Sequence, residues 1–141
     1  MTPSAIEAVL DRMHTVLGDF YAGVASRADM AGLLASDVAW HVPGTNAIAG
    51  DYRGVDEVIG YFTRRRNLAA GTFRMTPRDT LVGGSEHVGV LTDGTATIGG
   101  SERRWSTLGL YRISRDRIAE CWLLPLDPVA FDEIWTVSDM H

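Results

Sequence analysis

The stretch VAWHVPGTNAIAGDYRG, residues 38–54, is where the pattern of this 141-residue chain changes from helix to sheet. In residues 38–42, apolar side chains recur at every second position, which is the period of a strand with one buried face. A Pro-Gly pair then ends the run. We therefore expect Trp40 and Val42 on the buried face of a strand and His41 on the opposite face.

Helical periodicity precedes and follows this strand. Apolar residues recur every three or four positions over residues 6–24, and a short second helix is predicted over residues 29–35. A loop rich in Gly and Asn leads to a third helix over residues 55–68. Four β-like runs and a brief C-terminal helix come next: the runs cover residues 72–82, 86–98, 103–113 and 117–124, and the helix carries Phe131, Ile134 and Trp135. Because the connections between the runs are short, we expect an antiparallel meander.

This order of elements indicates an α+β fold in which one sheet covers its apolar face with helices. The length fits one domain with its own core, so residues 1–141 are predicted to form a single domain. A curved sheet wrapped over a few helices leaves a conical cavity. Such a cavity is the default ligand site of a small domain.

Charge and composition argue against several classes of partner. The 13 basic residues are all Arg and face 18 carboxylates, and the net charge of −5 argues against nucleic acid or an anionic membrane surface. The run Arg64-Arg65-Arg66 lies late in the third predicted helix, where cations complement the negative helix end. No apolar run has membrane-spanning length. The absence of Lys and Gln is typical of a high-GC bacterial codon pool.

Cysteine usage and the N-terminal sequence bear on compartment and cofactors. Cys121 is the single cysteine and can form no internal disulfide, and no Cys/His cluster has the spacing of a zinc site. The first residues carry no basic segment followed by an apolar run. We therefore expect a cytoplasmic protein that uses neither a metal nor an organic cofactor.

Four motifs, taken together, are typical of one protein family. They are WHVPG at 40–44, GDYRGVDEVI at 50–59, YRI at 111–113 and RIAECW at 117–122. With them the chain resembles the SnoaL-like branch of the NTF2-like superfamily. The resemblance implies a cone-shaped, curved antiparallel sheet wrapped over N-terminal helices, a homodimer, and a mostly apolar pocket. Relatives use this pocket for isomerisation, aldol cyclisation, epoxide hydrolysis or plain binding.

The catalytic carboxylates of two similar enzyme groups have apolar counterparts in this chain. Ketosteroid isomerases place a general-base Asp where this chain has Val42, and a second, protonated Asp where it has Leu108. Their pocket tyrosine has a possible counterpart in Tyr21. Limonene-type epoxide hydrolases use an Asp where this chain has Leu124. The resemblance therefore implies neither reaction in its usual form.

The last predicted strand leaves one acidic alternative open. SnoaL itself relies on an acidic residue of this strand, and Cys121, Leu123 and Leu124 offer none, so Glu120 is the remaining candidate. The two analogies disagree on which alternate positions of the strand face the cavity. Both orientations of Glu120 stay open at this point.

The candidate site residues follow from these comparisons and from residue chemistry. The candidate catalytic residues are Tyr21, His41, Glu120 and Asp127. Tyr21 is interpreted either as a hydrogen-bond donor to a ligand or as a core residue, and Asp127 either as an acid or as the N-cap of the last helix. The candidate ligand-pocket residues are Trp40, Val42, Phe62, Ser106, Leu108, Cys121 and Leu123.

The function predicted from the sequence is that of a small-molecule pocket protein. We expect it to act on an apolar polycyclic or polyketide-like compound as a cofactor-independent cyclase or isomerase, in a setting of secondary metabolism. Desolvation and conformational restraint can promote such a cyclisation even where acid–base assistance is weak. The alternative is a non-catalytic module of the same fold that binds or sequesters its ligand.

Overall fold

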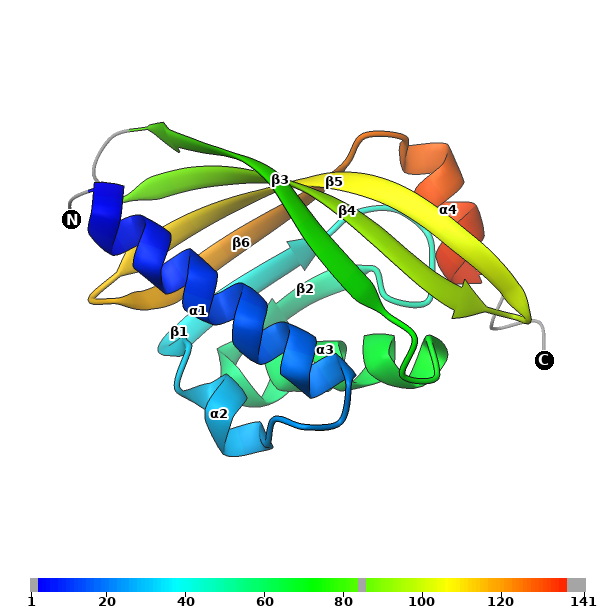
Figure 1. The fold of residues 1–141 in the computed structure, drawn as a ribbon, viewed down its shortest axis with the longest axis horizontal. Coiled ribbons are helices and arrows are strands. Elements are labelled where there is room, and N and C mark those ends of the chain that lie inside the picture. The colour runs from blue at the N-terminus through cyan, green and yellow to red at the C-terminus, as the bar shows by residue number, and fades with distance from the viewer. Residues whose placement is uncertain (1–2, 84–85, 137–141) are drawn as a thin grey trace.

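In a computed structural model, which describes residues 3–83 and 86–136, a curved six-stranded sheet wraps around helices on its hollow side (Figure 1). The elements in chain order are α1 (Pro3–Tyr21), α2 (Arg27–Ala31), β1 (Leu34–Val42), β2 (Gly50–Arg53), α3 (Gly54–Leu68), β3 (Arg74–Gly83), β4 (His87–Ile98), β5 (Ser101–Ser114), β6 (Arg117–Pro125) and α4 (Pro128–Thr136). The α+β fold predicted from the sequence is confirmed.

The strand order is β2-β1-β6-β5-β4-β3, with β2 and β3 as the edges of an open sheet. Strands β3 to β6 form the expected antiparallel meander. The pair of β1 and β6 is parallel, with Trp40 opposite Cys121, so the sheet is not antiparallel throughout. Strand β2 was not predicted. It forms because the loop after β1 turns back and pairs His41 with Asp51.

Two further boundaries differ from the sequence-based prediction. Helix α2 lies earlier than residues 29–35, because Ser26 and Asp29 form a capping box that starts the helix at Arg27. Strand β1 consequently begins at Leu34. Val24 continues the apolar stripe of α1 in sequence, but it lies beyond the helix and is 77% exposed.

The helices divide the inner face of the sheet between them. Helix α3 packs on β1 and β2, while α1 crosses toward β3 and α4 packs against β5 and β6 (Figure 1). Ile6, Leu10 and Leu17 of α1 are buried in the core, as expected from their spacing. No helix among the described residues is long and apolar enough to cross a membrane.

The loop after β1 is fixed to α4 by one carboxylate. Oδ1 of Asp132 accepts hydrogen bonds from the backbone N–H of Thr45, at 3.1 Å, and from Nδ2 of Asn46, at 2.7 Å. Gly44 has a φ of +97°, and a Cβ at this position would collide with the Asp132 carboxylate. Glycine is therefore required here both for its backbone conformation and for space.

Candidate functional site

A cavity lies between α1, α3 and the inner face of the sheet. Its volume is about 30 Å³, which is room for one or two water molecules. The lining residues come from most of the elements that surround it: Met13, His14, Leu17, Trp40, Arg65, Phe73, Met75, Thr92, Gly94, Trp105, Thr107, Tyr111 and Leu123. Among these described residues there is no Asp or Glu.

Aromatic rings make up much of the cavity wall. The ring of Trp40 packs edge-on against that of Tyr111, with centroids 5.9 Å apart, and Trp105 packs edge-on against Phe73 at 5.6 Å. Two strand positions must lack a side chain for this arrangement. A Cβ on Gly94 would lie 2.5 Å from the Trp105 indole, and a Cβ on Gly109 would lie 2.8 Å from the Tyr111 ring.

Arg65 brings a positive charge into this wall. Its side chain is buried, with 7% of the residue exposed, although the sequence predicted that the Arg64-Arg65-Arg66 run would serve the end of the helix. The Nε group donates to the hydroxyl oxygen of Tyr21 at 2.9 Å, and Nη1 donates to that of Tyr61 at 2.7 Å. Nη2 also donates to Tyr21. Burial raises the pKa of both phenols, so both partners are uncharged at neutral pH.

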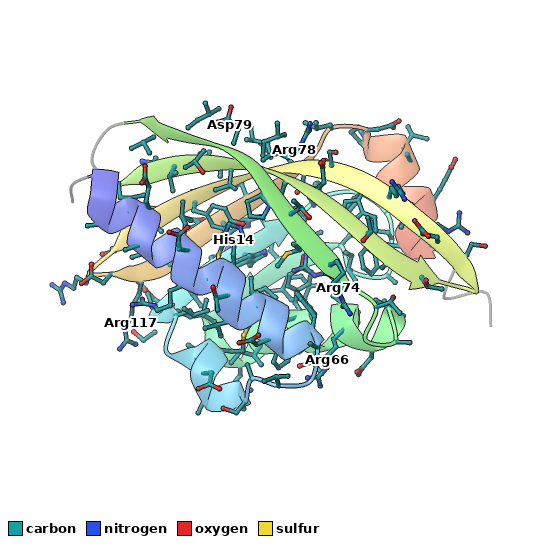
Figure 2. All side chains as sticks on the ribbon, viewed as in Figure 1. His14, Arg66, Arg74, Arg78, Asp79 and Arg117 are labelled. Atoms are coloured by element: carbon teal, nitrogen blue, oxygen red, sulfur yellow. The ribbon has the colours of Figure 1, made fainter. Side chains whose placement is uncertain are left out.

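His14 lies on α1 (Figure 2) and lines both the cavity and a surface groove between α1 and β3. Burial lowers the pKa of its imidazole, and the nearby carboxylate of Asp11 only partly opposes this shift. His14 is therefore neutral at physiological pH and has a nitrogen lone pair available. Among the described cavity residues it is the one side chain able to take up a proton near neutral pH.

The predicted pocket residues are found in three different places. Trp40 and Leu123 line the cavity. Phe62 and Cys121 are fully buried behind its wall, Phe62 in edge-on contact with Trp40 at 4.9 Å. The other three lie outside the cavity. Val42 is buried in the core on the same face of β1 as Trp40, as predicted, whereas Ser106, whose hydroxyl donates to Asp93 at 2.6 Å, and Leu108 lie on the outer face.

Strand parity explains this distribution. Trp40 is opposite Cys121 and Tyr111 is opposite Cys121, so positions 121 and 123 of β6 share the inner face with them. Leu108 is opposite Leu124, and both point outward. Burial of Trp40 and Cys121 therefore determines the orientation that the sequence comparison left open.

His41 and Glu120 lie on the outer face of the sheet, remote from the cavity lining. Nδ1 of His41 is 2.7 Å from Oδ1 of Asp51, and Nε2 is 2.6 Å from Oε2 of Glu120. Arg112 adds a longer ion pair to Glu120 at 3.6 Å. Burial lowers the pKa of His41, but the hydrogen bonds to Asp51 and Glu120 outweigh it, so the pKa is raised overall.

The remaining two catalytic candidates have structural contacts. Tyr21 is buried and accepts the hydrogen bonds of Arg65, and it is absent from the described cavity lining. Asp127 is exposed and caps α4, with Oδ1 accepting the backbone N–H of Ala130 at 3.1 Å. A catalytic role for any of the four candidates stays a prediction. Among the described residues, no group of three or more His, Cys, Asp or Glu side chains could hold a metal ion.

Sequence reasoning missed Arg65 and His14 as cavity residues, although helical spacing contained a signal for both. Val58 and Phe62 form the inner stripe of α3, and the next position of that stripe is residue 65. An arginine where the helical period requires an apolar residue indicates a buried charge. His14 follows Leu10 by four positions in the same way on α1.

Comparison with known proteins agrees with this fold. The SnoaL-like domain family matches residues 17–121 of the chain. An uncharacterized protein of Mycobacterium tuberculosis is 28% identical over 129 residues, which is 92% of this chain and 97% of that protein.

Solved structures extend the similarity to three dimensions. Bal32a, from a soil-derived mobile gene cassette, has a TM-score of 0.81 at 23% identity, over 93% of this chain and 98% of its own. An NTF2-like protein of Burkholderia xenovorans has a TM-score of 0.76 at 14% identity, over 96% of this chain and 99% of its own. With its family match over most of its length and its NTF2-like fold, this chain belongs to the SnoaL-like domain family.

Proposed function

We propose that this protein binds a small, flat organic molecule in the cavity between α1, α3 and the inner face of the sheet. The observation that carries the proposal is the composition of the cavity wall: aromatic rings enclose the space, and only a few polar side chains, Arg65 and His14 among them, line it. Ligand sites of small proteins combine an apolar wall with a few orienting polar groups in this way. The SnoaL-like fold supports a ligand-binding or isomerase-like role.

The cavity volume limits the size of the ligand. Drug-sized ligands occupy pockets of roughly 300–1,000 Å³, against about 30 Å³ here. Even a single aromatic ring would therefore require the wall to move apart, and a polycyclic or polyketide-like compound would require a larger movement. Met13 and Met75 line the cavity, and unbranched methionine side chains re-pack readily. We propose a ligand of one or two rings that enters beside His14.

The indole N–H resonances of the tryptophans provide the test. Trp40 and Trp105 line the cavity, whereas Trp122 lies on the outer face, stacked on His41. Titration with benzamide, a neutral single ring, should shift the NMR signals of Trp40 and Trp105 and leave that of Trp122 unchanged. A shift confined to Trp122, or no shift at saturating benzamide, would contradict the proposal.

His14 favours catalysis of proton transfer as a second candidate function. A neutral imidazole in the cavity can take a proton from a carbon next to a carbonyl group, leaving the electron pair on the carbonyl oxygen, and then return a proton to carbon. This is the chemistry of a cofactor-independent isomerase, and an aldol-type cyclisation starts with the same step.

Deuterium uptake by a simple ketone tests this second candidate. In D₂O, the wild-type protein should accelerate exchange at the carbon next to the carbonyl of 1-indanone, and His14→Asn should abolish the acceleration. His87→Asn is the matched control, because His87 is exposed on β4 and lines a groove on the outer face. A wild type that exchanges no faster than buffer would contradict catalysis on this ketone. If both variants exchange as fast as the wild type, His14 is not the base.

We further propose that a second copy of the chain covers the outer face of the sheet. This face presents the apolar side chains of Leu81, Leu108, Leu110, Trp122 and Leu124, of which Leu81 and Leu124 are 59% and 45% exposed. A contiguous exposed apolar patch of this kind marks an interaction site. The cytoplasm of a high-GC bacterium with secondary metabolism is the setting that we propose for the dimer.

Light scattering tests the homodimer. The chain mass is 15.4 kDa, so the wild type should give twice that value at micromolar concentration. Leu124→Glu should shift it to the monomer. Val24→Glu changes an equally apolar residue, 77% exposed after α1, and should leave the dimer intact. A wild-type mass near 15.4 kDa would refute the proposal.

A further inference from the structure

Arg65 is a buried cation that pairs with no carboxylate among the described residues. Among the described residues, none of the ion pairs involves Arg65 and no carboxylate lines the cavity. Its polar partners are the phenols of Tyr21 and Tyr61, which hydrogen-bond the guanidinium but carry no negative charge. The guanidinium carbon also lies 4.8 Å from the ring centroid of Tyr61 and 4.7 Å from that of Phe73. These contacts offset part of the cost of burial but do not neutralise the charge.

The guanidinium has donors to spare. An arginine carries five N–H groups, and three hydrogen bonds link Arg65 to the two phenols. Within the described part of the chain, one N–H on each of Nη1 and Nη2 therefore has no protein acceptor. Because Arg65 lines the cavity, a ligand there can take up these donors.

A second donor in the cavity wall is also unsatisfied. The indole Nε1 of Trp40 is buried and has no hydrogen-bond partner among the described residues, although Trp40 is only 2% exposed. An orphaned buried donor costs about 1–3 kcal/mol. The Trp40 N–H and the spare N–H groups of Arg65, on two residues that line one cavity, therefore favour a ligand that supplies acceptors. Positive charge, spare donors and the lack of acidic side chains in the described lining all select for negatively charged oxygen.

We propose that the cavity binds a flat organic molecule through a negatively charged oxygen, which accepts hydrogen bonds from the Arg65 guanidinium and the Trp40 indole N–H. The ligand either carries this charge when free, as a carboxylate, or acquires it in the cavity by losing the proton of an acidic enol or phenol to solvent. This inference rests on the proposed function, since it assigns the ligand class of the same cavity.

A matched pair of ligands tests the carboxylate. Benzoate and benzamide have nearly the same shape but differ in charge, and the wild type should bind benzoate at least tenfold more tightly by calorimetry. Arg65→Met should reduce the ratio to about one. Arg64→Met changes the neighbouring arginine, which is exposed and donates to the carbonyl of Ala47, and should preserve the ratio. Trp40→Phe keeps an aromatic six-membered ring but removes the N–H together with the rest of the five-membered ring, so a smaller loss of benzoate affinity is expected without a loss of fold.

An acidic phenol tests the second source of charge. 4-Nitrophenol changes its absorbance on ionisation, so a shift toward the phenolate spectrum on binding at constant pH reports stabilisation of the anion. The shift should disappear in Arg65→Met and persist in Arg64→Met. Benzoate preference without a phenolate shift identifies a ligand that is charged when free, and the reverse result identifies charge acquired in the cavity.

The inference and the proposed function fail separately. If benzamide shifts the Trp40 and Trp105 resonances while benzoate gains no affinity and 4-nitrophenol does not ionise, the cavity is a ligand site but the anionic ligand class is overturned. If no probe shifts these resonances, both are overturned. Should Arg65→Met fail to fold, the wild-type benzoate to benzamide ratio and the Trp40→Phe variant still decide between these outcomes.

Discussion

The position of the Trp105 ring depends on the absence of a side chain at Gly94. A Cβ at this position would lie 2.5 Å from Cε2 and 2.6 Å from Nε1 of the Trp105 indole, closer than carbon contacts normally allow. The ring cannot simply turn away, because it packs edge-on against Trp135 at 5.3 Å and against Phe73 at 5.6 Å. Gly94→Ala should therefore displace a side chain that lines the cavity.

Two opposing effects set the magnitude. Overpacking of a filled core costs about 1–3 kcal/mol, whereas the reduced freedom of the unfolded chain on changing Gly to Ala contributes about 0.4–1 kcal/mol of stability. The free energy of unfolding should thus fall by up to about 2.6 kcal/mol. For a chain of this length 1 kcal/mol corresponds to about 3–4 °C in Tm. We expect a decrease in Tm of up to about 10 °C.

The chain offers controls with the same chemical change. Gly89 lies on the same strand, and its added Cβ would lie 3.4 Å from Cδ1 of Leu108, an ordinary contact. Gly60 lies in α3, where an added Cβ would meet nothing within 4 Å. Gly60→Ala should raise stability by about 0.5–1 kcal/mol, and Gly89→Ala should leave it nearly unchanged. Denaturant unfolding followed by circular dichroism measures all three. A Gly94→Ala variant as stable as Gly60→Ala would refute the placement of Trp105.

Three further predictions concern charge, capping and the thiol. NMR titration should give a pKa below about 6.5 for His14 and a pKa above about 6.5 for His41. The stability that protonated His41 contributes is present below the usual histidine pKa and is lost as the pH rises through the raised pKa of His41. His14 has the opposite effect, because the folded protein loses stability as the pH falls below about 6.5. Equal pKa values would contradict both environments. Asp127→Ala should lower the free energy of unfolding by about 0.5–2 kcal/mol, because the backbone N–H of Ala130 loses its cap. Thermal unfolding measures this change, and an unchanged stability would show that the cap does not stabilise α4. Cys121, buried with a raised pKa, should react with a thiol reagent only after denaturation, and rapid reaction of the native protein would contradict its burial.

Periodicity was sufficient to predict most of the fold. The stripe of α1, the strand around Trp40 and the four runs of the meander follow local patterns of apolar residues, and such patterns depend little on distant contacts. Strand β2 is different. Gly50–Arg53 is too short to show a period, and it is a strand only because it pairs with β1 through a loop held by Asp132. The contact between Asp132 and Thr45 joins residues 87 positions apart, and no local sequence pattern indicates it.

The candidate site was harder to predict, because the residue types that suit catalysis are not the residues that the strands turn toward the cavity. Reasoning by residue type favoured His41 and Glu120, which are the kinds of side chain that enzymes use. Their position on the outer face follows from the parity of β1 and β6, and that parity was ambiguous in β6 until its parallel pairing with β1 was known. Arg65 was overlooked for the opposite reason, since arginine near a helix end has an ordinary explanation.

His41 on the outer face of the sheet and Arg65 on the inner face differ in whether carboxylates neutralise their positive charge. His41 has a carboxylate at each ring nitrogen, so its imidazolium donates in both directions and has no lone pair with which to accept a substrate proton. Its charge is fully compensated, and the network joins the edge strand β2 to β1 and β6. Arg65 is more deeply buried and, within the described residues, has no carboxylate at all. A charge whose partners lie within the protein needs no ligand, whereas an uncompensated buried charge has a desolvation cost that a negatively charged ligand can offset. That difference is why we assign the ligand site to the inner face of the sheet.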